Sequence, residues 1–446
     1  MTTTLVEGFE PDSVTLTRML KREGRRVTLA GLGPASQAAL ALRHEWIDVK
    51  GSASLDSDPG RHDEAFMDVW TPETAPRVRL LREQGCVLRC LGDLVLERST
   101  VPTIGVTGTA GKTTAAAFLT YLLRTAGVRV HASTTARASN LWPTAELLPP
   151  PTDGFIVMEL TSSHLCYTTR SPNIAVITCF WPDHLELHGS FEKYREAKSA
   201  IVRRQSPSDV VVVNEDDAGA AAIADLSPGR RYGFSARGEV PLGAFVHGKQ
   251  VVLRDEDGDK TFRLPQTLDG PRVQALLAAA AATLAAGAMP EQLQPPQSPP
   301  FRARRIGRMG ETELIDDSMA ATPAKTASTL DDRADDSVVL VAGGELEQAG
   351  LEVHASPEEE LLLELACAEA RRAARLVVLF GPAAVRLAPF FDKEKTIRAA
   401  SLEAAIRLAS ERAAGAEVLV VSPMFPLPLA DRERIAPALA AIADRE

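Results

Sequence analysis

A glycine-rich segment at residues 105–114 constrains the fold of this chain more than any other feature. It reads Gly-Val-Thr-Gly-Thr-Ala-Gly-Lys-Thr-Thr, overlaps the end of the short apolar run Thr103–Val106, and precedes an apolar helical pattern at Ala115–Thr125. A strand, a glycine-rich turn and a helix in this order form a phosphate-binding loop, whose backbone N–H groups face the phosphates. The segment therefore predicts an α/β domain that binds a nucleotide; a fortuitous glycine-rich turn is the alternative.

Side chains of this loop and of a later strand predict a site for a nucleotide and magnesium. Lys112 would reach the β- and γ-phosphates, and the Thr113 hydroxyl would contact Mg²⁺. Glu159 ends the apolar run Phe155–Met158, where α/β sheets place their ligands, and Mg²⁺ prefers such carboxylate oxygens. A surface glutamate is the alternative for Glu159. The predicted nucleotide contacts of the loop are Gly108, Thr109, Ala110, Gly111, Lys112, Thr113 and Thr114.

The length of the chain and a Pro-rich segment predict three domains. At roughly 100–200 residues per domain, the 446 residues suggest about three. The predicted ranges are 1–100, 101–300 and 301–446, with the Pro-rich segment 295–300 closing the second. Short apolar runs alternate with helical patterns in the first and last ranges. We therefore expect a Rossmann-like domain at each end and a central P-loop ATPase-type α/β domain between them.

The first βαβ unit can be read in two ways. In the preferred reading, strands at Thr4–Val6 and Val27–Ala30 flank a helix at Ser13–Arg22. In the other reading, the unit begins at Val27 and uses Gly31–Gly33 as its loop. The first is preferred because the apolar stripe of the helix needs a sheet to cover.

Composition argues against several classes of function. The net charge of −10 gives no overall attraction for nucleic acid or an anionic membrane. The apolar stretch Ala275–Ala288 is shorter than the ~20 residues that span a membrane, and the N-terminal residues do not read as a signal peptide. Five scattered cysteines suggest free thiols in a reducing compartment. We therefore expect a cytoplasmic protein, a monomer by default, whose partners are small molecules.

Two further motifs are ambiguous when taken alone. Asp183-His184 follows the apolar run Ile174–Thr178, and Lys198 ends the segment Tyr-Arg-Glu-Ala-Lys. An Asp-His pair after a strand can be an ordinary turn, and a single lysine on a helix is usually solvated.

Four segments taken together resemble the Mur ligases of peptidoglycan synthesis, most closely the branch that joins D-glutamate to UDP-N-acetylmuramoyl-L-alanine. The resemblance covers nearly the whole chain and is strongest in the central range. The segments are Gly-Thr-Ala-Gly-Lys-Thr-Thr (108–114), Glu-Leu-Thr-Ser-Ser (159–163), Asp-His-Leu-Glu-Leu-His with Tyr-Arg-Glu-Ala-Lys (183–198), and Arg302 with Asp316-Asp317-Ser318.

The resemblance implies an ATP-dependent ligase that activates a carboxylate as an acyl phosphate and transfers it to an amine. Lys112, Lys198 and His184 would be catalytic, and Lys198 would be carbamylated. Arg302 and Asp317 would contact the nucleotide. Two Mg²⁺ ions would be held by Thr113, Glu159, His184 and Lys198, and the substrates by Ser162, His164 and Ser422.

The chain departs from the family pattern at both ends. The first loop holds three carboxylates, which would repel a diphosphate, and a glutamate replaces the glycine expected after Pro72. In the third domain, two lysines expected to bind the carboxylates of glutamate are missing, and Lys325 is a candidate replacement. A further departure removes an expected adenine contact. The departing positions are Glu7, Glu10, Asp12, Glu73, Met319, Glu347 and 270–274.

Three functions remain open at this point. The first is the D-glutamate ligase of cell-wall synthesis, and the second is a Mur-like ligase for another carboxylate or amine, including L-glutamate. The third is a non-catalytic nucleotide-binding homologue. Its weakness is that a protein without catalysis has no need of the full set of predicted catalytic and metal-binding residues.

Overall fold

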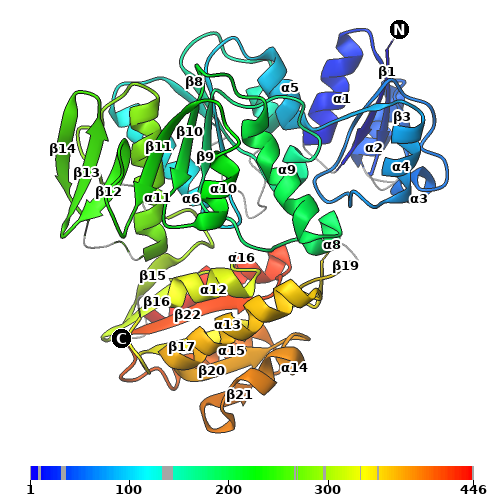
Figure 1. Cartoon of the computed structure of the whole chain (residues 1–446). Helices are drawn as coiled ribbons and strands as arrows, with labels where there is room; N and C mark the ends of the chain where they lie inside the picture. Colours follow the sequence, from blue (N-terminus) through cyan, green and yellow to red (C-terminus); the bar gives the residue numbers. More distant parts are fainter. Residues whose placement is uncertain are drawn as a thin grey trace.

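Three main sheets organise the chain, and each lies within one predicted domain range (Figure 1). The computed structural model describes residues 2–8, 12–31, 37–132, 144–265, 268, 270–294, 298–331, 333–348 and 351–443. The predicted fold class, an α/β chain of three domains, is confirmed. The domain boundaries themselves stay predictions, and residues 295–297 of the Pro-rich segment lie outside the described residues.

The N-terminal sheet is parallel, in the order β3-β2-β1-β4-β5. The helices α1, α2 and α5 cover one face, and α3 and α4 cover the other. The order of strands changes direction beside β1, which opens a crevice at the carboxyl ends of β1 and β4. The bounds are β1 Thr3–Glu7, α1 Asp12–Arg22, β2 Arg26–Ala30, α2 Gln37–His44, β3 Asp48–Lys50, α3 Ser52–Leu55, β4 Glu64–Phe66, α4 Pro76–Glu83, β5 Val87–Arg89 and α5 Leu91–Arg98.

The preferred reading of the first βαβ unit is confirmed, because β1, α1 and β2 follow it closely. Leu32 and Gly33 of the alternative loop lie outside the described residues. The apolar run Ala65–Trp70 predicts a strand over its whole length, but the strand β4 covers only Glu64–Phe66. It leaves the sheet after Phe66, because the Asp68 carboxylate accepts the Trp70 N–H at 2.8 Å and the Asp68 carbonyl accepts the Thr71 N–H, which forms a turn.

The central sheet has the order β14-β13-β12-β11-β10-β9-β6-β8-β7 and ends in an antiparallel hairpin of β13 and β14. The helices α6 and α11 cover one face, and α7, α9 and α10 cover the other. The Ala-rich segment becomes α11, whose residues Ala275–Leu284 are buried against this sheet. The bounds are β6 Thr103–Thr107, α6 Lys112–Thr125, β7 Val130–Ala132, η1 Thr144–Leu147, β8 Phe155–Glu159, α7 Ser162–Leu165, β9 Ile174–Ile177, α8 Leu185–His188, α9 Phe191–Arg203, β10 Val210–Asn214, α10 Ala218–Ala224, β11 Arg230–Ser235, β12 Gly243–His247, β13 Gln250–Asp255, β14 Gly258–Arg263 and α11 Gly270–Ala285.

The C-terminal sheet has the order β15-β16-β22-β17-β20-β21, and only its edge strand β15 is antiparallel to its neighbour among the described strands. The helices α12, α13 and α14 pack on one face, and α15 and α16 pack on the other. The bounds are β15 Arg304–Met309, β16 Thr312–Asp316, α12 Pro323–Leu330, β17 Val338–Gly343, β18 Glu347–Gln348, β19 Leu351–Glu352, α13 Pro357–Ala373, β20 Ala374–Phe380, α14 Ala384–Leu387, η2 Ala388–Phe390, η3 Lys393–Lys395, β21 Thr396–Arg398, α15 Leu402–Ser410, β22 Val418–Met424 and α16 Leu429–Ala443.

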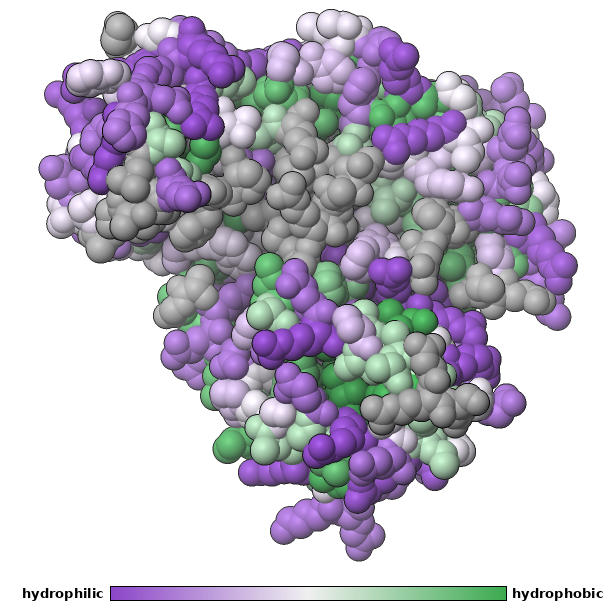
Figure 2. Space-filling view, turned by 180° about the vertical axis from the view of Figure 1, so that it is seen from behind, coloured by the Kyte–Doolittle hydropathy of each residue, from purple (hydrophilic) through white to green (hydrophobic). Residues whose placement is uncertain are grey.

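The C-terminal domain projects as a separate lobe from the body that the other two domains form (Figures 1 and 2). The ends of β6, β8 and β9 in the central domain face the loops after β16 and the helix α12 of this lobe, and a cavity lies between them. Across the described residues, none of the helices has the length and apolar character needed to cross a membrane.

Candidate active site

The phosphate loop runs from the end of β6 to the start of α6. Gly108 has a positive φ of +148°, and a Cβ at this position would lie 1.9 Å from Thr178 Oγ1, so only glycine fits. Gly111 adopts the left-handed conformation directly before α6. Lys112 folds back over the loop, and its Nζ donates to the carbonyls of Gly108 at 3.0 Å and Thr109 at 3.3 Å. The loop is thus a cradle around the helix N-terminus, as a phosphate site requires.

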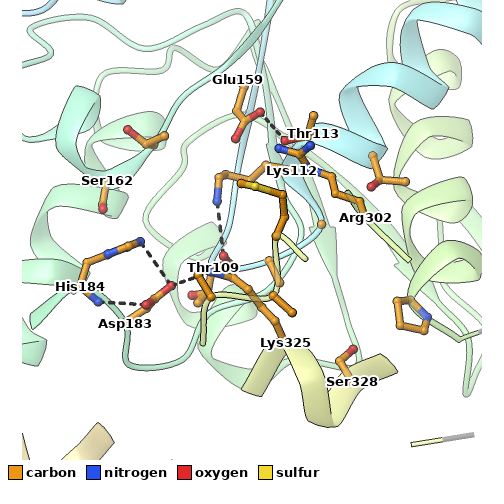
Figure 3. Close-up of a pocket in the computed structure, with 18 of the residues that line it drawn as sticks. Thr109, Lys112, Thr113, Glu159, Ser162, Asp183, His184, Arg302, Lys325 and Ser328 are labelled. Atoms are coloured by element: carbon orange, nitrogen blue, oxygen red, sulfur yellow. Dashed lines mark hydrogen bonds and ion pairs between the residues drawn. The ribbon is translucent and has the colours of Figure 1, made fainter. Parts of the chain in front are cut away.

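Thr113 and Glu159 form the oxygen-rich side of this cradle (Figure 3). The Thr113 hydroxyl donates to Glu159 Oε2 at 2.7 Å, and Glu159 is paired in register with Val106 on the neighbouring strand β6. Within the described ranges, no three His, Cys, Asp or Glu side chains converge as a metal cage. A hydroxyl beside one carboxylate fits Mg²⁺, which is usually held by few protein ligands together with phosphates and water.

Asp183 and His184 lie on another wall of the same cavity (Figure 3). His184 has a positive φ of 56° directly before α8, and its Nδ1 lies 3.2 Å from Glu186 Oε1. Asp183 is buried and accepts a hydrogen bond at 3.2 Å from Lys325 Nζ of the C-terminal domain. Burial opposes the shift, but the charges of His184 and Lys325 hold the pKa of Asp183 well below its usual range. Lys325 therefore joins the two domains through Asp183.

Lys198 is one of the largest fully buried side chains of the protein. It comes one helical turn after Tyr194 on α9, and its Nζ lies 4.9 Å from the centre of that ring and donates to Gly108 O at 2.9 Å. Burial, together with the charge of Lys112, lowers the pKa of Lys198 well below its usual range. The amine is thus beneath the phosphate loop in surroundings that favour its neutral, nucleophilic form.

Arg302 and Asp317 form the C-terminal wall of the cavity. The Asp317 carboxylate accepts the Ala303 N–H at 2.9 Å and hydroxyl hydrogen bonds from Thr329 and Ser422, each at 2.8 Å. Burial raises its pKa to about 7 despite these donors. Ser422 is fully buried behind Asp317 and does not line the cavity, so any effect on a substrate would act through Asp317.

Ser162 and His164 face different cavities. Ser162 lines the large cavity, whereas His164 lines a smaller one between the first and central domains. His164 Nδ1 lies 2.9 Å from the Thr161 hydroxyl in a capping box at the start of α7, and burial lowers the pKa of the ring to about 4. His164 is therefore a neutral hydrogen-bonding group near the first domain.

The acidic first loop has compensating partners that the local sequence does not reveal. Glu7 ends β1, is buried, and accepts hydrogen bonds from Arg77 Nε at 2.7 Å and the Thr71 hydroxyl at 2.9 Å. The Asp12 carboxylate accepts the Thr144 and Ala145 N–H groups. Glu10 lies outside the described residues. The charge of Glu7 is therefore paired with Arg77, while the repulsion of a diphosphate by this loop stays a prediction.

Several residues in the cavity were not assigned a role from sequence. Asp183 was part of an ambiguous pair, Lys325 was only a candidate replacement, and Arg272 and Arg432 were not considered as site residues. Arg272 belongs to the segment 270–274, which departs from the family pattern and was expected to lack an adenine contact. The segment nevertheless contributes the Arg272 cation to the lining of the cavity. Arg432 lies ten residues after Ser422, in a segment that contains no recognisable family motif, so its role had no signal in the sequence.

A phosphate loop and a metal-suited carboxylate, facing a third domain across a cavity, define a nucleotide-dependent enzyme assembled from three α/β domains. Residues 106–264 match the family described as the Mur ligase middle domain. The UDP-N-acetylmuramoylalanine–D-glutamate ligase of Symbiobacterium thermophilum is 30% identical over 439 residues, covering 94% of this chain and 92% of that protein. The protein of the same name from Koribacter versatilis is 28% identical over 440 residues, covering 94% and 91%. The chain belongs to the Mur ligase family and is an ATP-dependent C–N ligase.

Solved structures share the fold at low sequence identity. The chain is similar to a pseudomurein peptide ligase type C from Methanothermus fervidus, with a TM-score of 0.61, 17% identity and 100% coverage of both chains. It is also similar to the MurF ligase from Thermotoga maritima in complex with ADP, with a TM-score of 0.62, 17% identity, and coverage of 99% of this chain and 94% of that one.

Proposed function

We propose that this protein joins D-glutamate to UDP-N-acetylmuramoyl-L-alanine, using ATP, in peptidoglycan synthesis. One observation carries the proposal. The Thr113–Glu159 pair and the buried amine of Lys198 lie around one phosphate loop, opposite a wall formed by Arg302 and Asp317. The relatives that align with 94% of this chain are named for that reaction. We expect the enzyme to act as a monomer in the cytoplasm.

ATP would bind with its phosphates in the loop. Residues 108–114 would surround the β- and γ-phosphates, and Lys112 would turn from the carbonyls of Gly108 and Thr109 toward the γ-phosphoryl oxygens. Arg302 and Asp317 would contact the nucleotide from the C-terminal domain. Thr113, Glu159 and His184 would hold Mg²⁺, which supplies positive charge against the transferring phosphoryl group.

Lys198 would act after reaction with CO₂. Its neutral amine would attack the carbon of CO₂, forming an N–C bond and releasing one proton, so that a buried neutral amine becomes an anionic carbamate. The low pKa of the amine favours this step, because only the unprotonated form is nucleophilic. The carbamate oxygens would add a second hard ligand beside the phosphate loop.

The ligation would proceed in two transfers. A carboxylate oxygen of the UDP-linked substrate attacks the γ-phosphorus and ADP leaves, which gives an acyl phosphate. The amine of glutamate then attacks the acyl carbon, phosphate leaves, and the amine loses a proton to give the amide. Lys112 stabilises the charge on the transferring group, and the Lys325–Asp183 contact helps hold the C-terminal domain over the site, which excludes water.

The proposed substrate contacts lie toward the first domain and the central domain. Ser162 and His164, at the start of α7, would orient the UDP-linked substrate, each from its own cavity. Ser422 would act indirectly by fixing Asp317.

The test is phosphate release that requires both substrates. Purified enzyme with ATP and Mg²⁺ is expected to release phosphate only when UDP-N-acetylmuramoyl-L-alanine and D-glutamate are both present. The Lys193→Met variant, altered at an exposed lysine on α9, should match the wild type and controls for handling. Phosphate release that is independent of either substrate would refute the assignment.

A second candidate is a Mur-like ligase for a different carboxylate. The small cavity at the first domain is lined by Asp12 and Asp68 as well as by Glu7, whose charge is paired with Arg77, and the two remaining carboxylates are an unusual surrounding for a diphosphate. Calorimetry decides between the two. Micromolar binding of UDP-N-acetylmuramoyl-L-alanine supports the first candidate, whereas binding of ATP without the UDP-sugar supports the second.

A further inference from the structure

Three cations of the C-terminal domain line the large cavity among the residues that the structure describes, and they differ in what they face. Lys325 donates to Asp183 of the central domain at 3.2 Å. Arg302 is near Glu159 and Asp317: burial lowers its pKa, and these two carboxylates oppose the shift. Figure 3 shows the Arg302 side chain extending toward Thr113 and Glu159, on the phosphate side.

Arg432 is the third of these cations, and it lies where the charge of the lysine expected at position 319 is missing. It lies in the first turn of α16, where its Nη2 donates to Leu427 O at 2.6 Å and its Nη1 lies 2.8 Å from Met319 Sδ. Met319 is the position where a lysine was expected to bind the acceptor. In space, therefore, the guanidinium of a residue on α16 lies directly against the uncharged side chain of Met319, in the turn after β16.

The surroundings of Arg432 suit an anion. Burial, together with the charge of Arg302, lowers the pKa of Arg432 to about 10, so the group stays charged at neutral pH while two guanidinium groups repel each other on one wall. A carboxylate between them would relieve that repulsion, and the planar guanidinium matches a carboxylate in two parallel hydrogen bonds. The phosphates already have Lys112, the N-terminus of α6 and Arg302 on their side of the cavity.

We propose that Arg432 binds a carboxylate of the incoming amino acid and so determines the acceptor class of this ligase. This inference rests on the proposed function. It deepens that function by replacing the expected lysine at position 319 with an arginine from α16. The acceptor would lie between Arg432 and the acyl phosphate, with its amine directed at the acyl carbon.

Steady-state kinetics of Arg432→Gln test the proposal. The KM for D-glutamate should rise on the order of 10- to 100-fold, the loss expected for a charge-assisted hydrogen bond, while the KM for ATP stays within about twofold. Arg434→Gln is the matched control, because Arg434 lies two residues further along α16, is exposed, and pairs with Glu403 and Asp431. It should leave both constants unchanged. An unchanged glutamate KM in Arg432→Gln, or a rise only in the KM for ATP, overturns the proposal.

Moving the positive charge from position 432 to position 319 provides a second test if Arg432→Gln folds poorly. Met319→Lys alone should weaken glutamate binding, because a third cation would crowd Arg432 and Arg302. The double variant Met319→Lys/Arg432→Met should recover much of the affinity, because the charge returns to nearly the same place. A double variant no better than Arg432→Met contradicts the proposal.

The control outcomes separate this inference from the proposed function. A wild-type enzyme that uses another amino acid in place of D-glutamate refutes the glutamate assignment, and the same KM comparison is then made with that amino acid. A wild-type enzyme that uses no amino acid refutes both. Normal use of glutamate by Arg432→Gln refutes the role of Arg432 alone.

Discussion

Replacing Lys198 with methionine separates the chemistry of the buried amine from its contribution to stability. The side chain is 1% exposed, and methionine has a similar length and volume, so repacking should cost less than about 1.5 kcal/mol. The variant loses the hydrogen bond from Nζ to Gly108 O, worth about 1 kcal/mol. It also loses an amine whose charged form is disfavoured by burial, which offsets these costs. The free energy of unfolding should therefore change by no more than about 1–2 kcal/mol.

The pH dependence of this difference has a definite sign. Because the pKa of Lys198 is lowered in the folded state, the unfolded chain binds more protons between that pKa and the usual value of 10.5. Wild-type stability should therefore rise with pH in this window relative to Lys198→Met, which does not titrate. Urea denaturation of both proteins at neutral and alkaline pH measures the difference.

Ligation should respond very differently from stability. Methionine can neither form a carbamate nor act as an amine, so turnover should fall by about a thousandfold or more, and added bicarbonate should not restore it. Lys193→Met, on the exposed face of the same helix, should leave turnover and stability unchanged. Turnover above a tenth of wild type would refute the role of Lys198. A stability loss well above 3 kcal/mol would instead mean that its amine is needed for folding.

Three further substitutions test other parts of the site. Lys112→Ala should lower turnover by about 10²–10³-fold in the phosphate-release assay, and unchanged turnover would exclude this loop as the ATP site. Lys325→Met leaves the Asp183 carboxylate buried without its interdomain partner and should lower the free energy of unfolding, measured by denaturation, by about 3 kcal/mol. The double variant Asp183→Asn/Lys325→Met should recover most of this loss. An unchanged free energy of unfolding in Lys325→Met would mean that the contact does not hold the domains together. Asp317 has its pKa raised from 3.8 to about 7, so the folded state retains a proton that the unfolded chain has lost, and stability falls as pH rises through this window. Asp317→Asn should therefore gain up to about 4 kcal/mol relative to wild type between pH 4 and pH 8; a difference that is independent of pH would contradict this pKa.

The features that sequence predicted well depend on neighbouring residues. The phosphate loop follows from a strand, three glycines and a helix within about a dozen positions, and each constrains the backbone locally. The same holds for the first βαβ unit, where a helix of period 3.6 lies between two short strands. The strand at 65–70 was predicted too long because the apolar run continues through the turn that Asp68 forms.

The features that sequence missed depend on residues far apart along the chain. Glu7 is paired with Arg77, which lies 70 residues away. A count of the charges in the first loop alone therefore overstates how strongly this loop repels an anion. Lys325 reaches Asp183 across 142 residues and between domains. Arg432 approaches Met319 only because α16 packs beside the loop after β16, and neither local pattern contains that information.

The burial of Lys198 is an intermediate case. The helical spacing places it on the same face as Tyr194 and Ile201, both of which are buried, so the pattern around it favours an inward side chain. A lysine nonetheless usually extends to solvent, and only the position of α9 beneath the phosphate loop leaves it no route there.

Transfer of an oxygen atom from the carboxylate substrate to phosphate tests the central claim most directly. UDP-N-acetylmuramoyl-L-alanine labelled with ¹⁸O in its carboxylate would be incubated with the enzyme, ATP, Mg²⁺ and D-glutamate, and the released phosphate would be analysed by mass spectrometry. An acyl-phosphate ligase leaves one ¹⁸O atom in each phosphate, because the oxygen that attacked the γ-phosphorus departs with it. Formation of ADP with unlabelled phosphate would show that water is the acceptor and would contradict the assignment.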